Sequence, residues 1–306
     1  MQLSVFIEAM YFAPKWYHYP LIVLLLPLSM IYGVLMYLRR RFTAKKSYGI
    51  PMISVGNLVI GGSGKTPFTI ALALEYDGVA VISRGYGRKS SGLVEVSRNG
   101  KILTDVQKSG DEPMLMARSL PNASVIVSED RHRAIELARE NGARLIILDD
   151  GFNRVEIEKF EIILEPASIK NYLPFPSGPF REFWFTEKYA DIVAKEGRDF
   201  SREVEVKNIK PKMLLITAIS NPQRLDPYLP EGVVRKIYLP DHEYFDEAKV
   251  GKIFAEYGAD SILCTSKDRV KMEGFTLPIS ELKLKLNIED GIIGKIQAYI
   301  QSKSEK

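Results

Sequence analysis

The sequence predicts an α/β protein of two units preceded by a membrane helix. Three observations support this: short apolar runs alternate with helical stretches, a glycine-rich loop joins one run to a helix, and an uncharged apolar run lies near the N-terminus. A chain of 306 residues suits two α/β units better than one domain. The chain has 46% hydrophobic and 26% charged residues, and this composition excludes a disordered or low-complexity protein.

Charge and cysteine usage narrow the class further. The net charge is +4, and residues 1–50 hold six basic residues against one acidic residue, so the positive excess lies at one end. We therefore expect no nucleic-acid partner. The single cysteine, Cys264, excludes an intrachain disulfide framework and a cysteine-based zinc cluster, and it fits a reducing compartment.

The N-terminal segment, residues 1–40, is predicted to anchor the protein in a membrane. Residues 21–38 carry no charge and would extend about 27 Å as a helix, close to the hydrocarbon thickness of a bilayer. Aromatic residues precede this run, and Arg39, Arg40 and Arg41 follow it, an order opposite to that of a signal peptide. The basic flank places the rest of the chain in the cytoplasm. Spanning and interfacial insertion both stay open, and a buried core helix is the soluble alternative.

The next segment, residues 41–200, is predicted to form a parallel sheet with helices on both faces. A hairpin is expected around Asn99-Gly100, and a linker near 197–211. The remaining segment, residues 201–306, is predicted to be a second, smaller α/β domain. The expected strands lie at 51–59, 79–83, 124–128, 144–150, 160–164, 213–219, 233–239 and 261–266.

A phosphate-binding loop is predicted where the first of these strands meets its helix. Glycines there let backbone N–H groups surround phosphate oxygens at a helix N-terminus, so the core is predicted to be P-loop NTPase-like. Lys65 would reach the β- and γ-phosphates, and Thr66 would place its hydroxyl on Mg²⁺. Val59 stands where the usual motif begins with glycine. The predicted nucleotide-binding residues are Ile60, Gly61, Gly62, Ser63, Gly64, Lys65, Thr66 and Pro67.

An acidic pair, Asp149-Asp150, ends the apolar run 144–150. In P-loop enzymes an aspartate at such a strand end holds Mg²⁺. Adjacent residues of an extended strand point to opposite faces, so one carboxylate would take the metal while the other orients water or substrate. The sequence does not say which does which. A solvated turn is the alternative, since Asp-Asp-Gly also favours turns.

Several short segments, taken in order, resemble the tetraacyldisaccharide 4'-kinase family, which acts on lipid A precursors of Gram-negative envelopes. The chain departs from the family at Asn153, where Gln followed by His-Arg is usual and Arg154 follows directly here. The segments that carry the resemblance are 55–67, 83–88, 110–115, 149–152, 173–182, 220–225, 239–245 and 265–268.

The resemblance implies a kinase that uses ATP and Mg²⁺ to phosphorylate the 4'-hydroxyl of a tetraacyldisaccharide 1-phosphate. It implies a place on the cytoplasmic face of the inner membrane, with the second domain, residues 201–306, closing over the nucleotide site. The acylated disaccharide and the membrane are the expected partners, and we expect a monomer. The alternative is a membrane-tethered P-loop GTPase or ATPase without lipid kinase activity, although Lys267 and Asp268 are adjacent and so do not fit a guanine-reading motif.

For the reaction, the resemblance favours Asp111 as the base that accepts the hydroxyl proton, paired with His242. From the residues alone, Asp111 is equally a helix N-cap and His242 a structural histidine. Glu112 and Glu182 would hold arginines or contribute to the metal site, and His132 receives no role. The candidate arginine clamps for phosphate are Arg84 and Arg181, ranked first, and then Arg88 and Arg131.

Overall fold

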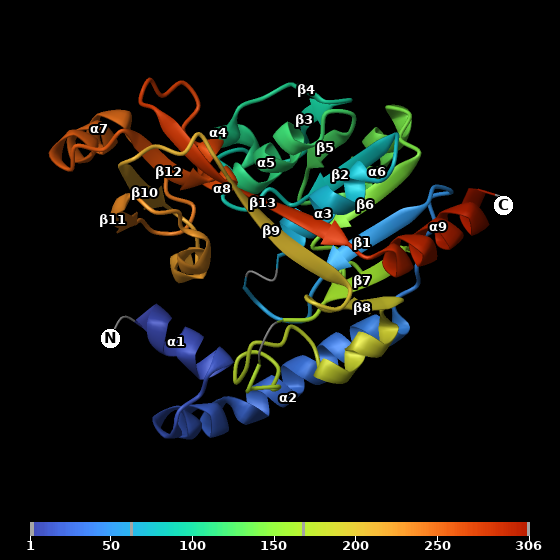
Figure 1. Ribbon diagram of the computed structural model, residues 1–306. Coiled ribbons are helices and arrows are strands. Elements are labelled where there is room, and N and C mark those ends of the chain that lie inside the picture. The colour runs from blue at the N-terminus through green and yellow to red at the C-terminus, as the bar shows by residue number, and fades with distance from the viewer. Residues whose placement is uncertain (1–2, 62–63, 167–168, 305–306) are drawn as a thin grey trace. The chain divides into compact units, whose positions relative to one another are not determined.

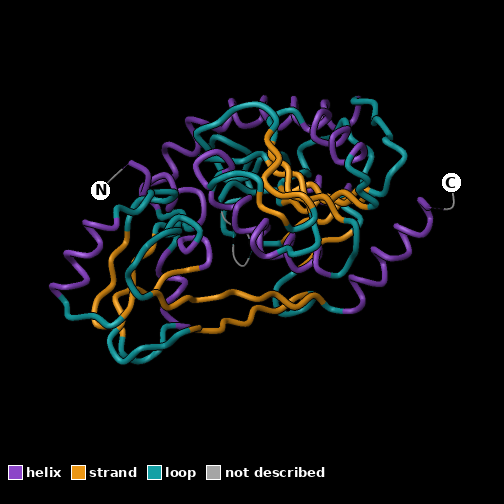
Figure 2. The backbone as a smooth tube through the Cα atoms, turned by 90° about the horizontal axis from the view of Figure 1, so that it is seen from above, coloured by secondary structure: helices purple, strands orange, loops and turns teal. Residues whose placement is uncertain are grey.

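The computed structural model of the chain describes residues 3–61, 64–166 and 169–304 (Figures 1 and 2). It divides into two compact units, each assembled from separate stretches of the chain. Unit 1 comprises Met1–Thr69, Arg144–Ser201 and Ile288–Lys306, and unit 2 comprises Ile70–Ala143 and Arg202–Asn287.

Unit 1 contains four neighbouring parallel strands in the order β6-β1-β7-β8. Every residue of β1 and β6 is buried, as expected for strands covered on both faces. In the register of this pair, Val55 of β1 lies opposite Asp149 of β6. The predicted parallel α/β fold is confirmed. The strands span Met52–Gly56 (β1), Leu145–Asp149 (β6), Phe160–Leu164 (β7) and Ile192–Ala194 (β8).

Most helices of unit 1 come from the two ends of the chain. The long helix α2 contains Pro27 and ends at Phe42 after three arginines. The C-terminal helix α9 packs Tyr299 against Phe160, with ring centroids 5.0 Å apart. The helices are α1 (Leu3–Phe12), η1 (Trp16–His18), α2 (Tyr19–Phe42), η2 (Trp184–Tyr189) and α9 (Asp290–Ser304), and α3 (Lys65–Leu74) begins in this unit.

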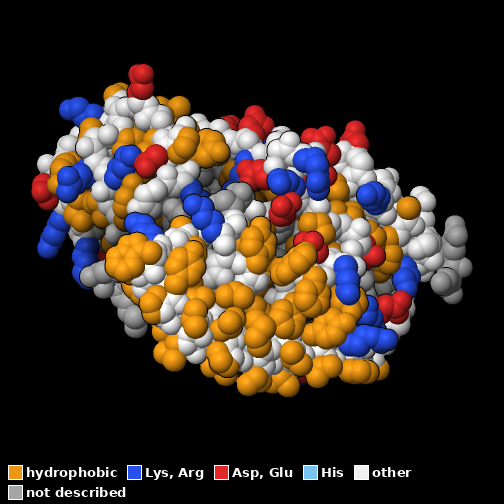
Figure 3. All heavy atoms as spheres, turned by 90° about the horizontal axis from the view of Figure 1, so that it is seen from below, with side chains coloured by type: hydrophobic (Ala, Val, Ile, Leu, Met, Phe, Trp, Pro, Cys, Tyr) orange, Lys and Arg blue, Asp and Glu red, His pale blue; other side chains and the backbone are white. Residues whose placement is uncertain are grey.

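Helix α2 has two different faces. Ile22, Ser29 and Gly33 are buried against the loop 171–185. The opposite face is apolar and exposed, with 74% of Leu24 accessible, and Figure 3 shows such side chains gathered along it. Among the described residues, Trp16–Phe42 is the one helical stretch long and apolar enough to cross a membrane. Length and composition thus associate this end of the chain with a membrane.

In unit 2, four strands lie in the order β4-β3-β5-β2. The pair β2–β5 is parallel, while β3 runs antiparallel to both β5 and β4. The predicted hairpin at Asn99-Gly100 is confirmed, and both residues have the positive φ that a two-residue turn requires. The elements are β2 (Val79–Ser83), β3 (Val94–Arg98), β4 (Lys101–Ile102), α4 (Val106–Ser109), α5 (Asp111–Ser119), β5 (Ser124–Val127) and α6 (Arg131–Glu140).

The second sheet has the strand order β11-β10-β12-β13-β9. The linker predicted near 197–211 was wrong, because β9 fills Phe200–Lys207 with alternately exposed side chains. The strand β13 was not predicted either. The elements are β9, β10 (Met213–Thr217), η3 (Pro222–Tyr228), β11 (Val233–Tyr238), α7 (Glu247–Glu256), β12 (Ser261–Thr265), α8 (Ser266–Arg269) and β13 (Ile279–Ile288).

Candidate active site

The glycine-rich loop of unit 1 follows β1 and leads into α3, as predicted. Gly61 and Gly64 have φ values of 99° and 82°, which side chains other than glycine rarely adopt. Lys65 opens α3, and its Nζ donates to Asn57 Oδ1 at 3.1 Å. Gly62 and Ser63 lie outside the described residues.

The acidic pair ends β6 beside this loop. Asp149 is the last strand residue and only 4% exposed, whereas Asp150 has a φ of 54° and leaves the strand. Arg181 Nη1 donates to both carboxylate oxygens of Asp150, at 2.8 and 2.9 Å, and Lys65 Nζ lies 3.7 Å from Oδ1. Two cations and one carboxylate therefore meet at the loop. We call Asn57, Lys65, Asp150 and Arg181 the loop cluster.

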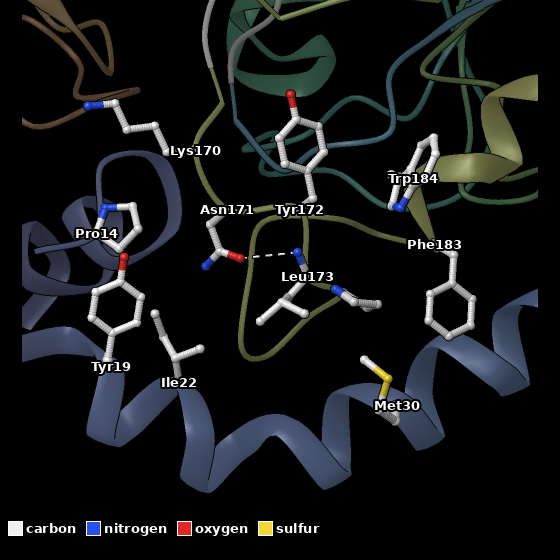
Figure 4. Close-up of a pocket in the computed structure, with 11 residues that line it drawn as sticks. Pro14, Tyr19, Ile22, Met30, Lys170, Asn171, Tyr172, Leu173, Phe183 and Trp184 are labelled. Carbon is white, nitrogen blue, oxygen red and sulfur yellow. Dashed lines mark hydrogen bonds between the residues drawn. The ribbon is translucent and has the colours of Figure 1, made fainter. Parts of the chain in front are cut away.

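The segment that supplies Arg181 is fastened to the glycine-rich loop by backbone hydrogen bonds. Arg181 N donates to Leu58 O at 2.8 Å, and Ile60 N donates to Pro179 O at 2.9 Å. Between the same segment and α2 lies a mostly apolar cavity of about 540 Å³. Figure 4 shows Ile22 and Met30 on α2 facing it from one side and Leu173 from the other, with Lys170 near its edge.

In unit 2, a second group of charged side chains surrounds the N-terminus of α5. Asp111 is the first residue of that helix, and both its oxygens lie within hydrogen-bond distance of His242 Nδ1, at 3.0 and 2.9 Å. Lys267 Nζ lies 3.7 Å from Asp111, 3.2 Å from Glu112 and 3.5 Å from Asp241. We call Asp111, Glu112, Asp241, His242 and Lys267 the α5 cluster.

Burial and charge act against each other in the α5 cluster. Burial raises the pKa of Asp111, but the hydrogen bond from His242 and the positive charge of Lys267 outweigh it, so its pKa is lowered. The same hydrogen bond raises the pKa of His242 against the effect of burial. Burial lowers the pKa of Lys267, and the carboxylates of Glu112 and Asp111 reverse this to a net rise. The pair therefore favours aspartate and imidazolium.

The loops that hold this cluster are themselves fastened by a buried carboxylate. Asp268 is fully buried, and it accepts from Thr217 Oγ1 at 2.6 Å and from Ala218 N at 3.1 Å. Ala218 O in turn accepts from His242 N at 3.2 Å. Asp268 thereby connects two segments that support the cluster. One is the loop after β10, to which the His242 backbone is hydrogen-bonded, and the other is α8, which supplies Lys267.

The comparisons with known proteins agree with one another. A sequence profile described as tetraacyldisaccharide-1-P 4'-kinase (LpxK) matches residues 21–213. The tetraacyldisaccharide 4'-kinase of Helicobacter pylori (strain HPAG1) is 45% identical over 97% of this chain and 95% of its own length. That of Aliarcobacter butzleri (strain RM4018) is 43% identical over 98% of each chain. The chain belongs to the tetraacyldisaccharide 4'-kinase family.

A solved structure of the family has the same fold. The crystal structure of LpxK from Aquifex aeolicus in complex with ATP matches this chain with a TM-score of 0.75 and 27% sequence identity. The match covers 92% of this chain and 99% of that one. The resemblance predicted from the short segments is confirmed, and the protein is a kinase.

The structure brings some predicted site residues together and separates others. Lys65, Asp150 and Arg181 meet in the loop cluster, and Asp111 and His242 meet in the α5 cluster. Thr66 and Pro67 lie in the first turn of α3. Arg84 is exposed on the loop after β2.

The remaining candidate residues hold the protein itself together. Arg131 is buried and donates to Ser128 O at 2.5 Å. Arg88 pairs with Glu129. Glu112 pairs with Lys267, and Glu182 is buried against Arg40.

Four residues of these networks were missed by sequence reasoning: Asn57, Asp241, Lys267 and Arg40. The first three stand inside the segments 55–67, 239–245 and 265–268 that carry the family resemblance, which is the signal that pointed to them. The sequence places Arg40 in the basic flank that faces the membrane. Its side chain is instead only 6% exposed.

Proposed function

We propose that this kinase transfers the γ-phosphoryl group of ATP to the 4'-hydroxyl of a tetraacyldisaccharide 1-phosphate. The observation that carries the proposal is the loop cluster, because it sets Lys65, Asp150 and Arg181 around a phosphate-binding loop. Family membership along nearly the whole chain supports the lipid acceptor. The ATP complex of the Aquifex aeolicus protein supports ATP as the donor.

In this proposal the loop cluster stabilises charge on the transferring group. Phosphoryl transfer demands positioning and fixed positive charge more than covalent chemistry. Lys65 faces the β- and γ-phosphates, and its hydrogen bond to Asn57 keeps the amine oriented before nucleotide binds. Arg181 is held by Asp150 and extends the positive surface toward substrate phosphate.

The residues present also suit Mg²⁺. A buried carboxylate at the end of β6, Asp149, and the hydroxyl of Thr66 are the hard oxygen donors that Mg²⁺ prefers. No group of three or more His, Cys, Asp or Glu is arranged to hold a metal within the described ranges, which fits an ion bound largely by phosphates and water. Bound there, Mg²⁺ would neutralise phosphate charge.

We propose that Asp111 accepts the proton of the attacking hydroxyl. The carboxylate is ionised and therefore able to accept a proton, although its lowered pKa makes it a weaker base than an ordinary aspartate. His242 orients that carboxylate, and Lys267 neutralises the surplus negative charge. Turnover also requires the hydroxyl to reach the γ-phosphate, so we propose that the part of residues 201–306 that belongs to unit 2 closes over the bound nucleotide.

We propose further that α2 lies along the membrane interface, with the kinase on the cytoplasmic face of the inner membrane. Contacts between α2 and the loop 171–185 extend from Ile22, whose carbonyl accepts from Ser177 Oγ at 2.9 Å, to Arg40. A spanning helix would carry this loop and its polar backbone into hydrocarbon, which is strongly disfavoured. The exposed apolar face opposite would insert instead (Figure 3).

The apolar cavity beside α2 suits part of the lipid. Its lining includes Ile22, Met30, Leu173 and Trp184, and its volume of about 540 Å³ is within the range of small-ligand sites. It adjoins the segment that supplies Arg181, so an acyl chain held there would keep its sugar near the loop cluster. We therefore propose that one acyl chain of the acceptor occupies it.

The test is phosphorylation of purified tetraacyldisaccharide 1-phosphate in mixed micelles, with ATP or GTP as donor. We expect a product heavier by one phosphoryl group with ATP, formed roughly 10³-fold more slowly by the Lys65→Ala variant. Nucleotide hydrolysis without a phosphorylated lipid would instead support the membrane-tethered GTPase or ATPase. Equal use of GTP would contradict ATP as the specific donor.

A further inference from the structure

Arg40, in the last turn of α2, is bound inside the protein. Its Nε donates to Glu182 Oε2 at 2.6 Å and its Nη2 to Glu182 Oε1 at 2.7 Å. Both side chains are almost completely buried, at 6% and 4% exposed. The planar guanidinium fork and the carboxylate thus form a two-point contact that a lysine cannot reproduce.

The same guanidinium also holds a second segment. Its Nη2 donates to Phe152 O at 3.0 Å, and its carbon lies 3.9 Å from the centre of the Phe152 ring. Phe152 follows β6, whereas Glu182 belongs to the loop after β7. One side chain from the membrane helix therefore joins two segments that are distant in sequence.

These two segments each carry half of the ion pair in the loop cluster. Asp150 stands two residues before Phe152, and Arg181 stands one residue before Glu182. Phe152 has little freedom, because it is 1% exposed and packs so closely on the Gly56 backbone that a side chain at Gly56 would clash with it. A shift of Arg40 would therefore be passed to Asp150, whose carboxylate lies 3.7 Å from Lys65.

We propose that Arg40 is a positioning residue that sets the geometry of Asp150 and Arg181 from the membrane helix. Turnover then depends on α2 being packed against the loop 171–185. This dependence connects membrane attachment to phosphoryl transfer. The inference rests on the proposed function, because it names a residue that supports the same site.

The experiment measures kcat, the KM for ATP and the melting temperature of the full-length kinase in micelles. The variants are Arg40→Ala, Arg40→Lys and, as a control, Arg198→Ala, which removes an exposed arginine from a surface pair with Asp199. Ethylguanidinium is added to each, because the space left by Arg40→Ala can accept a guanidinium group.

We expect Arg40→Ala to lose roughly 10²-fold in kcat, the scale of a small misplacement of catalytic groups. Ethylguanidinium should restore part of that loss, and Arg40→Lys should fall between the wild type and Arg40→Ala. Arg198→Ala should match the wild type with and without the additive. A purely structural role would lower the melting temperature but leave the kcat of the folded enzyme unchanged.

Wild-type kcat in Arg40→Ala, or a loss that ethylguanidinium does not reverse, would overturn the inference. If Arg40→Ala does not fold, Arg40→Lys decides: a reduced kcat supports the role and a wild-type kcat overturns it. A wild-type enzyme that fails to phosphorylate the lipid would count against the proposed function. ATP affinity, measured by nucleotide fluorescence, would then still report whether Arg40 shapes the loop.

Discussion

The loop cluster and the α5 cluster contain similar residues but are suited to different chemistry. In the loop cluster, Lys65 and Arg181 face one carboxylate, Asp150, so positive charge is in excess. In the α5 cluster, Lys267 lies near three carboxylates, and one of these, Asp111, is hydrogen-bonded to His242. An excess of cations suits phosphate, whereas an ionised carboxylate beside an imidazole suits a proton.

The two clusters are also built differently. Parallel strands end at the same edge of a sheet, so Val55 opposite Asp149 brings the acidic pair beside the glycine-rich loop. Asp111 and His242 are separated by 131 positions and meet because loops carry them together. His242 even adopts a φ of 64°, an unusual conformation for a side-chain-bearing residue. Strand ends fix the first cluster, and loop conformation fixes the second.

The largest effect should come from removing the cation of the loop cluster. We expect Lys65→Ala to lower kcat by roughly 10³-fold, because one preorganised donor to the developing charge is lost. Lys195→Ala, which removes an exposed lysine near Glu165, is the matched control and should be unaffected. Turnover within a few-fold of wild type in Lys65→Ala would remove the phosphate-binding role from this loop.

In the α5 cluster, Asp111 and His242 should act as a unit when they are substituted. Asp111→Asn and His242→Asn should each lower kcat by roughly 10²-fold, near the lower end of general-base effects, with little change in ATP affinity. Asparagine is the suitable replacement at His242 because it tolerates the positive φ. The double variant should lose little more than the worse single variant. Multiplicative losses would show independent roles. A normal kcat in Asp111→Asn would leave Asp111 with only a structural role in the first turn of α5.

The two aspartates that end β6 should separate in a Mg²⁺ titration. Asp149→Asn should raise the Mg²⁺ concentration for half-maximal activity by about tenfold or more, the least that residues around metal ligands usually contribute. Asp150→Asn should lower kcat without that shift, because Asp150 organises Arg181 and Lys65. The reverse pattern would exchange the two roles.

Much of the fold and the loop cluster could be predicted from the sequence. Fully buried strands such as β1 and β6 appear as continuous apolar runs, and a glycine-rich loop between such a strand and a helix is typical of phosphate binding. The pairing of Asp111 with His242 came only through the family resemblance, since no local pattern joins residues so far apart in sequence.

The errors have physical causes as well. The segment that forms β9 has the composition of a linker, because its outward side chains are charged and only every second residue is covered. Arg40 has the sequence position of a lipid-facing residue, because arginines after an apolar helix usually mark a membrane boundary. Whether such an arginine faces lipid or Glu182 depends on tertiary packing, which a single sequence does not contain.

The smallest effect we predict is on stability, and it should depend on pH. The pKa of Asp111 is lowered, so its contribution to the free energy of unfolding is present above its ordinary pKa and is lost as pH falls through the lowered value. The pKa of His242 is raised, chiefly by its hydrogen bond to Asp111, so its contribution is complete below about pH 6.5 and is lost as pH rises through the raised value. The pair therefore stabilises unit 2 most between about pH 5 and 6.5.

His242→Asn should therefore lower the melting temperature more at pH 6 than at pH 9. A difference of about 1 kcal/mol corresponds to about 2–4 °C in a domain of this size. The other charged groups facing His242 are Asp241, at 3.6 Å, and Lys267. An equal loss at both pH values would mean that His242 contributes packing alone, and would leave Lys267 as the group that keeps Asp111 ionised.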